Sequence, residues 1–383
     1  MVTGATKRWG WAALLCAAQI VGCGGQERPR TAPPASIGNV RVPPGEFGRN
    51  VVRVGGLSPA DVAGSAALAM FSAGQPPTGW ILARDDDWHD TVLAAQFAAG
   101  PVYAGLLAVE PDYLPTAATD VLKRVRPRAF PKAKGLQGLV VGGATPDLFG
   151  DVDQLGLKIS LLKAASPEAL ALQTVPYRGG FSGAYSDSVM IVSNAERDYA
   201  LPAAAWSAYS GDTLAFTDRD DLPRATRDLL VQREKLRIEK PSIYIVGPPS
   251  AVSASVAAEL RRYGPVQRIT GDTPAEVSVN FARYHDPNTG FGWGVGKGPS
   301  SISLVNRHQW ANAIGAFSFA ARGPQAPLLL LDRNDRLPAV VADYLDDLAR
   351  RGGGQVYAFG DRRSITTAVL RQVDTKISKG DRA

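Results

Sequence analysis

ISLVNRHQWANAIGAFSFAARGPQAPLLLL, residues 302–331, is the stretch that decides the fold of this chain. An apolar segment of strand length leads into an alanine-rich segment of helical length, and a second apolar strand follows. A strand, a helix and a strand in this order are the parts of a parallel βαβ unit. The stretch contains no recognisable catalytic motif, so its apolar residues are expected mainly to pack.

The same kind of unit recurs along the chain. Trp88, Tyr199 and Trp310 each begin an alanine-rich helical segment, and successive members are 111 residues apart. Two further markers occur three times in the same order, namely an N-cap residue followed by proline at a helix start, and a Leu-Pro pair before another helix. They are Ser58-Pro59, Ser166-Pro167 and Thr273-Pro274, and Leu114-Pro115, Leu222-Pro223 and Leu337-Pro338. Markers that recur together indicate a tandem repeat.

Each period alternates apolar strands with helices of about 12 residues, which predicts parallel sheets covered by helices on both faces. In the first period we expect strands at 51–56, 80–84, 104–109 and 139–141, and helices at 59–71, 88–99 and 114–125. The predicted fold class is therefore α/β, with three tandem Rossmann-like or flavodoxin-like repeats. Their boundaries are 46–155, 156–265 and 266–378, the middle repeat being the most divergent, and 379–383 form a polar tail.

A glycine-rich insertion separates the first predicted helix from the second predicted strand in every repeat. The insertions occupy 72–79, 177–188 and 285–300. The three insertions occupy the same position in each repeat, so they mark one equivalent edge. Exposed loops tolerate variation and often carry function, which makes this edge a candidate binding region. Phe291, Trp293 and Lys297 of the third insertion are candidates to contact a glycan, although a mobile loop is the simpler interpretation.

The N-terminus has the features of a bacterial export signal. Lys7 and Arg8 precede a short apolar core, and I-V-G-C at 20–23 resembles the lipobox in which the cysteine is lipidated. We expect a signal peptide at 1–23 that ends at a lipidated Cys23, with an ordinary secretory signal as the alternative. Residues 24–45 are rich in Pro and Gly and are expected to form a linker between the lipid and the fold. The protein would then be exported and lipid-anchored at the outer face of the cytoplasmic membrane or in the cell envelope.

The net charge of the chain restricts the possible binding partners only weakly. The formal charge is +6, or +4 without Lys7 and Arg8, which is compatible with an anionic polymer or lipid headgroup. We expect no nucleic-acid partner, because of the predicted export signal and because Lys and Arg are taken to be dispersed rather than clustered. With no cysteine after Cys23, the fold has to be stabilised by its core and not by disulfides.

These motifs together resemble the cell wall-binding repeat 2 family of bacterial surface proteins. The residues that carry the likeness are QRITG at 267–271, WANAIGAFSFAA at 310–321, APLLLL at 326–331 and RLP at 336–338, with VRVGG, WHDTVLAAQFAA and GLVVGG in the first repeat. The resemblance implies non-catalytic retention at the envelope by binding an anionic cell-wall polysaccharide, such as a teichoic-acid-like polymer or another acidic glycan. It also implies a pseudo-threefold arrangement of the repeats. The second arginine usual in the family is missing after the first strand, and Leu161 occupies the column of Arg53 and Arg268.

Four residues of the repeats are predicted, together with Lys297, as polymer ligands. Arg53 and Arg268 in the first strands have guanidinium groups suited to phosphate or carboxylate, while a structural ion pair between repeats is the alternative. Trp88 and Trp310 can stack on sugar rings, while packing between repeats is the alternative. The chain offers no G-x-S-x-G motif and no carboxylate pair that stands out as catalytic, so we predict no enzyme and no cofactor.

Three other interpretations are weaker. A metal site at Asp85, Asp86, Asp87 and His89 is disfavoured because consecutive side chains do not converge on one ion, so we expect a solvated loop and no metal. A solute receptor would have two lobes in place of three equal repeats. An envelope hydrolase lacks its catalytic residues. A surface-anchored protein that keeps the repeat fold as a scaffold for a solute or protein partner is the main alternative to polymer binding.

Overall fold

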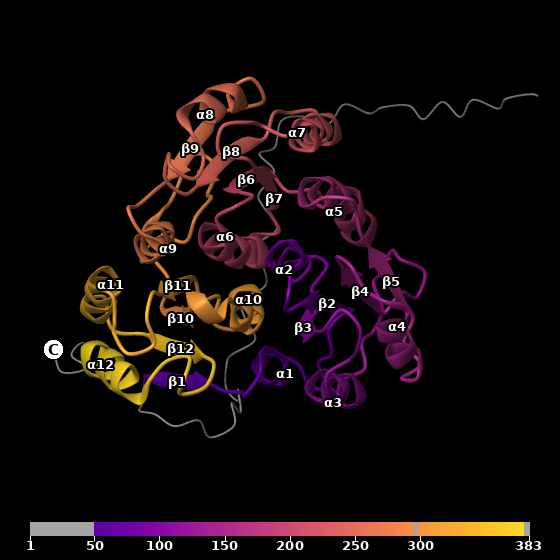
Figure 1. Cartoon of the computed structure of the whole chain (residues 1–383), viewed down its shortest axis with the longest axis horizontal. Coiled ribbons are helices and arrows are strands. Elements are labelled where there is room, and N and C mark those ends of the chain that lie inside the picture. Colours follow the sequence, from indigo (N-terminus) through magenta and orange to yellow (C-terminus); the bar gives the residue numbers. More distant parts are fainter. Residues whose placement is uncertain (1–49, 295–297, 379–383) are drawn as a thin grey trace, which may run out of the picture. The chain divides into compact units, whose positions relative to one another are not determined.

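In the computed structural model, which describes residues 50–294 and 298–378, parallel strands alternate with helices along the chain (Figure 1). All these residues belong to the unit Ile37–Ala383, one of two compact units in the chain. Cys23, Lys297, the linker at 24–45 and the tail at 379–383 lie outside the described residues. Within the described ranges, no helix has the length and apolar character needed to cross a membrane.

The strands form three sheets of four, and every pairing within them is parallel. Sheet 1 contains, in spatial order, β3 (Gly105–Val109), β2 (Trp80–Arg84), β4 (Gly138–Val141) and β5 (Ile159–Leu162). Sheet 2 contains β7 (Thr213–Thr217), β6 (Ser188–Ser193), β8 (Ser242–Val246) and β9 (Val266–Ile269). Sheet 3 contains β1 (Val51–Val54), β12 (Gln355–Phe359), β10 (Ser301–Asn306) and β11 (Leu328–Leu331).

Helices connect the strands as the βαβ pattern predicts. In the first third of the chain they are α1 (Pro59–Met70), α2 (Trp88–Ala95), α3 (Thr116–Arg124) and α4 (Pro146–Asp153). The middle third contains α5 (Pro167–Ser182), α6 (Arg197–Ser210), α7 (Arg224–Arg237) and α8 (Ala254–Leu260). The last third contains α9 (Pro274–Arg283), the 3-10 helix η1 (Arg307–Asn312), α10 (Ala313–Ala321), α11 (Ala339–Arg350) and α12 (Thr367–Ile377). The predicted α/β class with three tandem parallel-sheet repeats is confirmed.

The three predicted N-caps are also confirmed. The hydroxyl of Ser58 accepts the amide of Asp61, and Ser166 and Thr273 do the same at α5 and α9. At Trp310 the expected α-helix start is wrong. This residue lies in the 3-10 helix η1, because Gln309 has non-helical angles (φ −118°, ψ 50°) and breaks the first turn.

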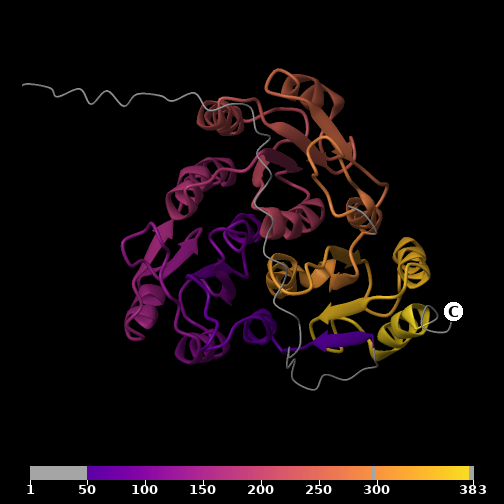
Figure 2. The same ribbon diagram turned by 180° about the vertical axis from the view of Figure 1, so that it is seen from behind.

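Each sheet takes its last strand from the next repeat of the sequence. Strand β5 begins the second period but pairs with β4 in sheet 1, and β9 begins the third period but pairs with β8 in sheet 2. Strand β1 closes the series by pairing with β12, at the other end of the chain. Figures 1 and 2 show this contact as the indigo strand beside the yellow one. The sequence period and the sheets are therefore offset by one strand.

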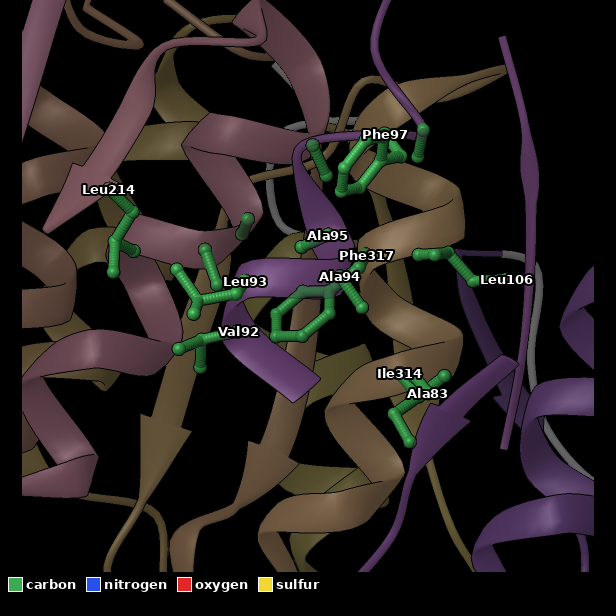
Figure 3. Packing of buried hydrophobic residues seen from close by; sticks show 14 of the residues in the cluster. Ala83, Val92, Leu93, Ala94, Ala95, Phe97, Leu106, Leu214, Ile314 and Phe317 are labelled. Carbon is green, nitrogen blue, oxygen red and sulfur yellow. The ribbon is translucent and has the colours of Figure 1, made fainter. Parts of the chain in front are cut away.

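Equivalent helices of the three repeats meet at the centre of the fold. Helices α2, α6 and α10 contact one another, as a pseudo-threefold arrangement requires. Their facing surfaces are rich in alanine, so the backbones approach closely. Figure 3 shows Leu93 and Ala94 of α2 beside α10, which contributes Ile314 and Phe317 to the same apolar cluster. One continuous apolar core therefore connects residues from all three repeats.

The described parts of two predicted insertions are packed into the fold. Residues 177–182 continue α5, which runs to Ser182 and ends at Gly183 in the left-handed conformation (φ 74°). In the third insertion Phe291 and Trp293 are buried, and the Phe291 ring stacks on Tyr244 at 3.6 Å. Trp293 lies edge-on to Trp206 at 5.1 Å. These aromatic side chains gain more by packing than by remaining in water, and they are not available to a glycan.

Removing the Phe317 ring tests the central packing. Phe317 is 1% exposed, so Phe317→Ala leaves a cavity and is expected to lower the free energy of unfolding by about 3–5 kcal/mol. Urea titration followed by circular dichroism measures this change. Leu68→Ala, at a side chain that is 37% exposed, is the control and should cost far less. A loss below about 1 kcal/mol for Phe317→Ala would show that the helix contact is loose.

Candidate binding surface

The two predicted arginine ligands bind backbone carbonyls within the fold. Arg53 Nη1 donates hydrogen bonds to the carbonyls of Gly360 (3.0 Å) and Asp361 (2.7 Å), and its Nη2 donates to Ile365 (2.7 Å). The residue is only 7% exposed, and burial lowers the pKa of its guanidinium. Arg53 therefore holds the segment that follows β12 and presents no free guanidinium fork to a polymer.

Arg268 occupies the same place in sheet 2. Its Nη1 donates to the carbonyl of Gly247 (2.9 Å), and its Nη2 donates to that of Val252 (2.7 Å), so it holds the segment that follows β8. Burial lowers the pKa of this group as well. In sheet 1 the corresponding register position, beside Val140, is Leu161, and no guanidinium reaches the segment after β4 from this position. The contacts of Arg53 and Arg268 are therefore neither free forks for a polymer nor the ion pair between repeats that was the alternative. Both guanidiniums bind backbone carbonyls.

Trp88 and Trp310 lie half-buried where repeats meet. The Trp88 ring stacks on His89 (3.6 Å between ring centroids) and lies edge-on to Phe216 of the second repeat (5.8 Å). The guanidinium of Arg197, also from the second repeat, lies 5.7 Å from the centroid of the Trp310 ring. Both rings make the contacts between repeats that were considered as the alternative to sugar stacking.

The acidic loop after β2 distributes its carboxylates among different partners. Asp86 pairs with Arg84 (2.7 Å), and Asp87 caps α2 by accepting the amide of His89 (2.9 Å). Burial, followed by the nearby charges of Glu110 and Asp86, raises the pKa of Asp85 to about 7. No group of three metal-ligating side chains gathers here or elsewhere in the ranges that the structure describes.

A basic segment between α3 and β4 was missed in the sequence. Thirteen residues, 125–137, connect α3 to β4, whereas four residues make the corresponding connections at 238–241 and 351–354. The expectation that Lys and Arg are dispersed is wrong here, because no acidic residue lies between positions 121 and 137. Six cations gather in 12 residues, namely Lys123, Arg124, Arg126, Arg128, Lys132 and Lys134.

Apolar anchors hold this insertion against sheet 1. Val125 and Phe130 are buried, and the Phe130 ring stacks on Phe181 of α5 at 4.4 Å. The carbonyl of Val125 accepts the indole N–H of Trp80 (3.0 Å), and the amide of Arg128 donates to the carbonyl of Pro77 (3.0 Å). Because buried and exposed residues alternate over 125–128, the side chains of Arg126 and Arg128 project outward from this anchored backbone.

The six cations, two in the last turn of α3 and four in the insertion, are called the basic surface below, together with Lys158 and Arg322. All six are exposed, and within 50–294 and 298–378 none of them forms an ion pair with a carboxylate. Lys158 Nζ donates to the carbonyl of Lys134 (3.3 Å), which places it at the same edge. Burial and repulsion from Arg128 lower the pKa of Arg322, so these two guanidiniums are close. The surface lies where β2 and β4 begin and has the charge and donors of an anion-binding surface.

The fold and this surface define a protein of three tandem parallel α/β repeats with one basic insertion. No family model matches the chain. It is 22% identical over 321 residues to the Amidase enhancer of Bacillus subtilis (strain 168), covering 82% of this chain and 38% of that protein.

Two solved structures share the fold. Cwp8 from Clostridium difficile superposes with a TM-score of 0.69 at 17% identity, covering 86% of this chain and 52% of that one. Cwp6 from the same organism gives a TM-score of 0.68 at 14% identity, covering 88% and 51%. The chain thus spans about half of each of these structures and less of the curated relative. At such identities the likeness establishes the fold.

Replacing Arg53 by lysine tests its structural role. An ammonium group reaches fewer carbonyls than the guanidinium fork, so Arg53→Lys should lower the free energy of unfolding by about 1.5–3 kcal/mol. Chemical denaturation provides the measurement. Arg363→Lys, at a side chain that is 75% exposed, is the control. Equal stability of Arg53→Lys and the wild type would contradict the role derived from the carbonyl contacts.

The Asp85 carboxyl predicts a pH dependence of stability. Its pKa is about 7 in the folded protein, against 3.8 for an ordinary aspartate, so the folded state binds the proton more tightly. Stability from this group is therefore complete below pH 3.8 and is lost as pH rises through about 7. Asp85→Asn should raise the melting temperature more at pH 8 than at pH 5. The exposed Asp153→Asn is the control, and an equal shift at both pH values for Asp85→Asn would contradict the prediction.

Proposed function

We propose that this is a non-catalytic cell-envelope protein that holds an anionic wall polymer on its basic surface. The observation that carries the proposal is the insertion at 125–137, where exposed cations have no carboxylate partner among the residues that the structure describes, although acidic residues are plentiful elsewhere in the chain. The fold is shared with Cwp6 and Cwp8, which are cell wall proteins, and the sequence is similar to an amidase enhancer. These likenesses support a role at the wall without turnover.

The geometry suits a polymer better than a small ion. The cations are spread from the end of α3 along the insertion and are not gathered in a pocket, so repeated phosphates or carboxylates of one chain can each meet a different side chain. Arginine offers paired donors to such groups, and lysine offers a mobile point charge. Because Val125 and Phe130 fix the backbone, little conformational freedom of the main chain is lost on binding.

The proposal includes the lipid anchor at Cys23. A lipid at the end of the linker 24–45 would hold the protein at the membrane, and the basic surface would bind polymer in the adjoining wall. The proposed location is therefore the outer face of the cytoplasmic membrane or the envelope. Mass spectrometry of the protein purified from its native envelope would show a lipidated N-terminal cysteine if the anchor is present.

Neutralising the basic surface tests polymer binding. The triple variant Arg124→Gln, Arg128→Gln and Lys132→Gln removes three exposed contacts of roughly 0.2–1 kcal/mol each, which predicts roughly 3- to 150-fold weaker binding to purified teichoic acid. Calorimetric titration at low and high salt gives the affinity and its salt dependence. Binding by the wild type should weaken as salt rises, and this dependence should be shallower in the variant.

A matched variant controls for net charge. Arg224→Gln, Lys235→Gln and Lys240→Gln remove the same charge from exposed positions on and after α7 in the second repeat. This control should bind like the wild type. If both triple variants lose affinity equally, only net charge matters. If the wild type binds no anionic polymer, the protein is better described as a scaffold for another partner.

A further inference from the structure

A second site lies at the opposite ends of the strands, in sheet 3. A cavity of about 320 Å³ opens where β1, β12 and β10 end. The chain leaves β10 toward β11 on one side and returns to β12 on the other, so this is the point where the strand order reverses. In open parallel sheets, ligands bind in the crevice outside the carboxyl ends of the strands at such a point. The volume is at the lower limit of ligand pockets, about 300 Å³.

The pocket is polar but carries little net charge. Its two fully charged lining groups are Asp361 and Arg363, and they neutralise each other, with Arg363 Nε donating to Asp361 Oδ2 at 2.7 Å. The N-terminus of α1 also borders the pocket, but its positive end is already met by Asp61. Asp61 Oδ2 accepts the amides of Leu57 (3.2 Å) and Ser58 (3.0 Å). A phosphate would therefore meet a carboxylate here and not a free helix end.

The remaining lining combines apolar surface with hydrogen-bonding groups, among them the exposed imidazole of His308. Leu57 is 82% exposed at one edge, and Trp310 lines the same pocket. Gln309 is exposed and provides an amide donor and acceptor. Asn312 adds a buried amide, whose Nδ2 lies 3.4 Å from Ser364 Oγ. This combination matches a sugar ring, which has apolar C–H faces and hydroxyl groups around its edge.

The second repeat fixes the tryptophan of the pocket. Arg197 lies over one face of the Trp310 ring, and its Nη2 also donates to the carbonyl of Arg307 at 3.1 Å. Arg307 in turn pairs with Asp198 at 2.6 Å. Because Arg197 and its partners hold the ring, a ligand in the pocket meets an indole that is already oriented, which lowers the ordering cost of binding.

We propose that this pocket, bordered by Leu57, Gln309, Trp310 and Asn312, binds a single uncharged sugar ring. The site is separate from the basic surface, which lies in sheet 1 at the opposite strand ends. It differs in chemistry as well, because its ligand is neutral and contributes stacking and hydrogen bonds in place of charge. The inference does not depend on polymer binding by the basic surface.

Saturation-transfer NMR on the full chain tests the proposal. The probes are methyl glucoside and N-acetylglucosamine as neutral rings, with glucuronate and inorganic phosphate as charged comparisons. Neutral rings should show contact and a millimolar Kd. Gln309→Ala should weaken this binding about fivefold, the change expected for one ordinary hydrogen bond. Leu57→Ser should weaken it as well, and both side chains are exposed, so neither variant should impair folding.

Controls come from the other repeats. Trp310→Phe keeps an aromatic ring and should alter sugar binding, whereas Trp88→Phe, at the equivalent place in the first repeat, should not. Val231→Ser matches Leu57→Ser at another exposed apolar residue and should bind like the wild type. The proposal is overturned if no neutral sugar binds, if glucuronate or phosphate binds better, or if the pocket variants bind as tightly as the wild type. The triple variant of the basic surface should keep its sugar binding, which separates failure here from failure of the proposed function.

Discussion

The pairing of β1 with β12 is the constraint on which the rest of the structure depends. It joins the first described strand to the last one, and β5 and β9 make the corresponding exchanges between neighbouring repeats. Every sheet therefore depends on residues from two repeats, and none is complete without its neighbour. Because parallel ladders are formed between distant segments, the order of the three repeats is fixed by backbone hydrogen bonds as well as by the apolar core.

The arginines of β1 and β9 reinforce this exchange. Each enters a sheet on the borrowed strand and binds carbonyls of the segment that follows the adjacent strand. Sheet 1 lacks such an arginine, because Leu161 occupies the corresponding position on β5. Sheet 1 also carries the long insertion between α3 and β4. Both departures from repeat symmetry thus fall at sheet 1, one in the first repeat and one in the strand taken from the second.

The two proposed sites use opposite ends of parallel strands. The basic surface occupies the edge where strands of sheet 1 begin, and the pocket occupies the edge where strands of sheet 3 end. The first site is built from exposed charge on a rigid insertion. The second is built from neutral groups around an indole that the neighbouring repeat orients. A wall glycan presents both kinds of group, namely acidic substituents and neutral rings, so the two sites can engage one class of polymer.

The repeat period and the alternation of apolar strands with helices were sufficient to predict the fold class from the sequence. The 111-residue spacing and the Ser-Pro and Thr-Pro helix starts are local patterns, and local patterns determine which segments become helices or strands. The helices α4, α8 and α12 were not assigned, because they lie between the recurring markers. The basic segment, with six cations in 12 residues, could also be read from the sequence. It was recognised only when the length of the connection between α3 and β4 was compared with the two equivalent connections.

The sequence by itself determined the three repeats, their parallel βαβ construction and the charge of the insertion. Tertiary structure alone decided that β1 joins the last sheet, that Arg53 and Arg268 bind carbonyls, and that Phe291 and Trp293 are buried. The physical reason is the distance along the chain over which each interaction acts. Helix and strand formation follows from neighbours along the chain, whereas a guanidinium or an aromatic ring finds its partner among residues that only folding brings close.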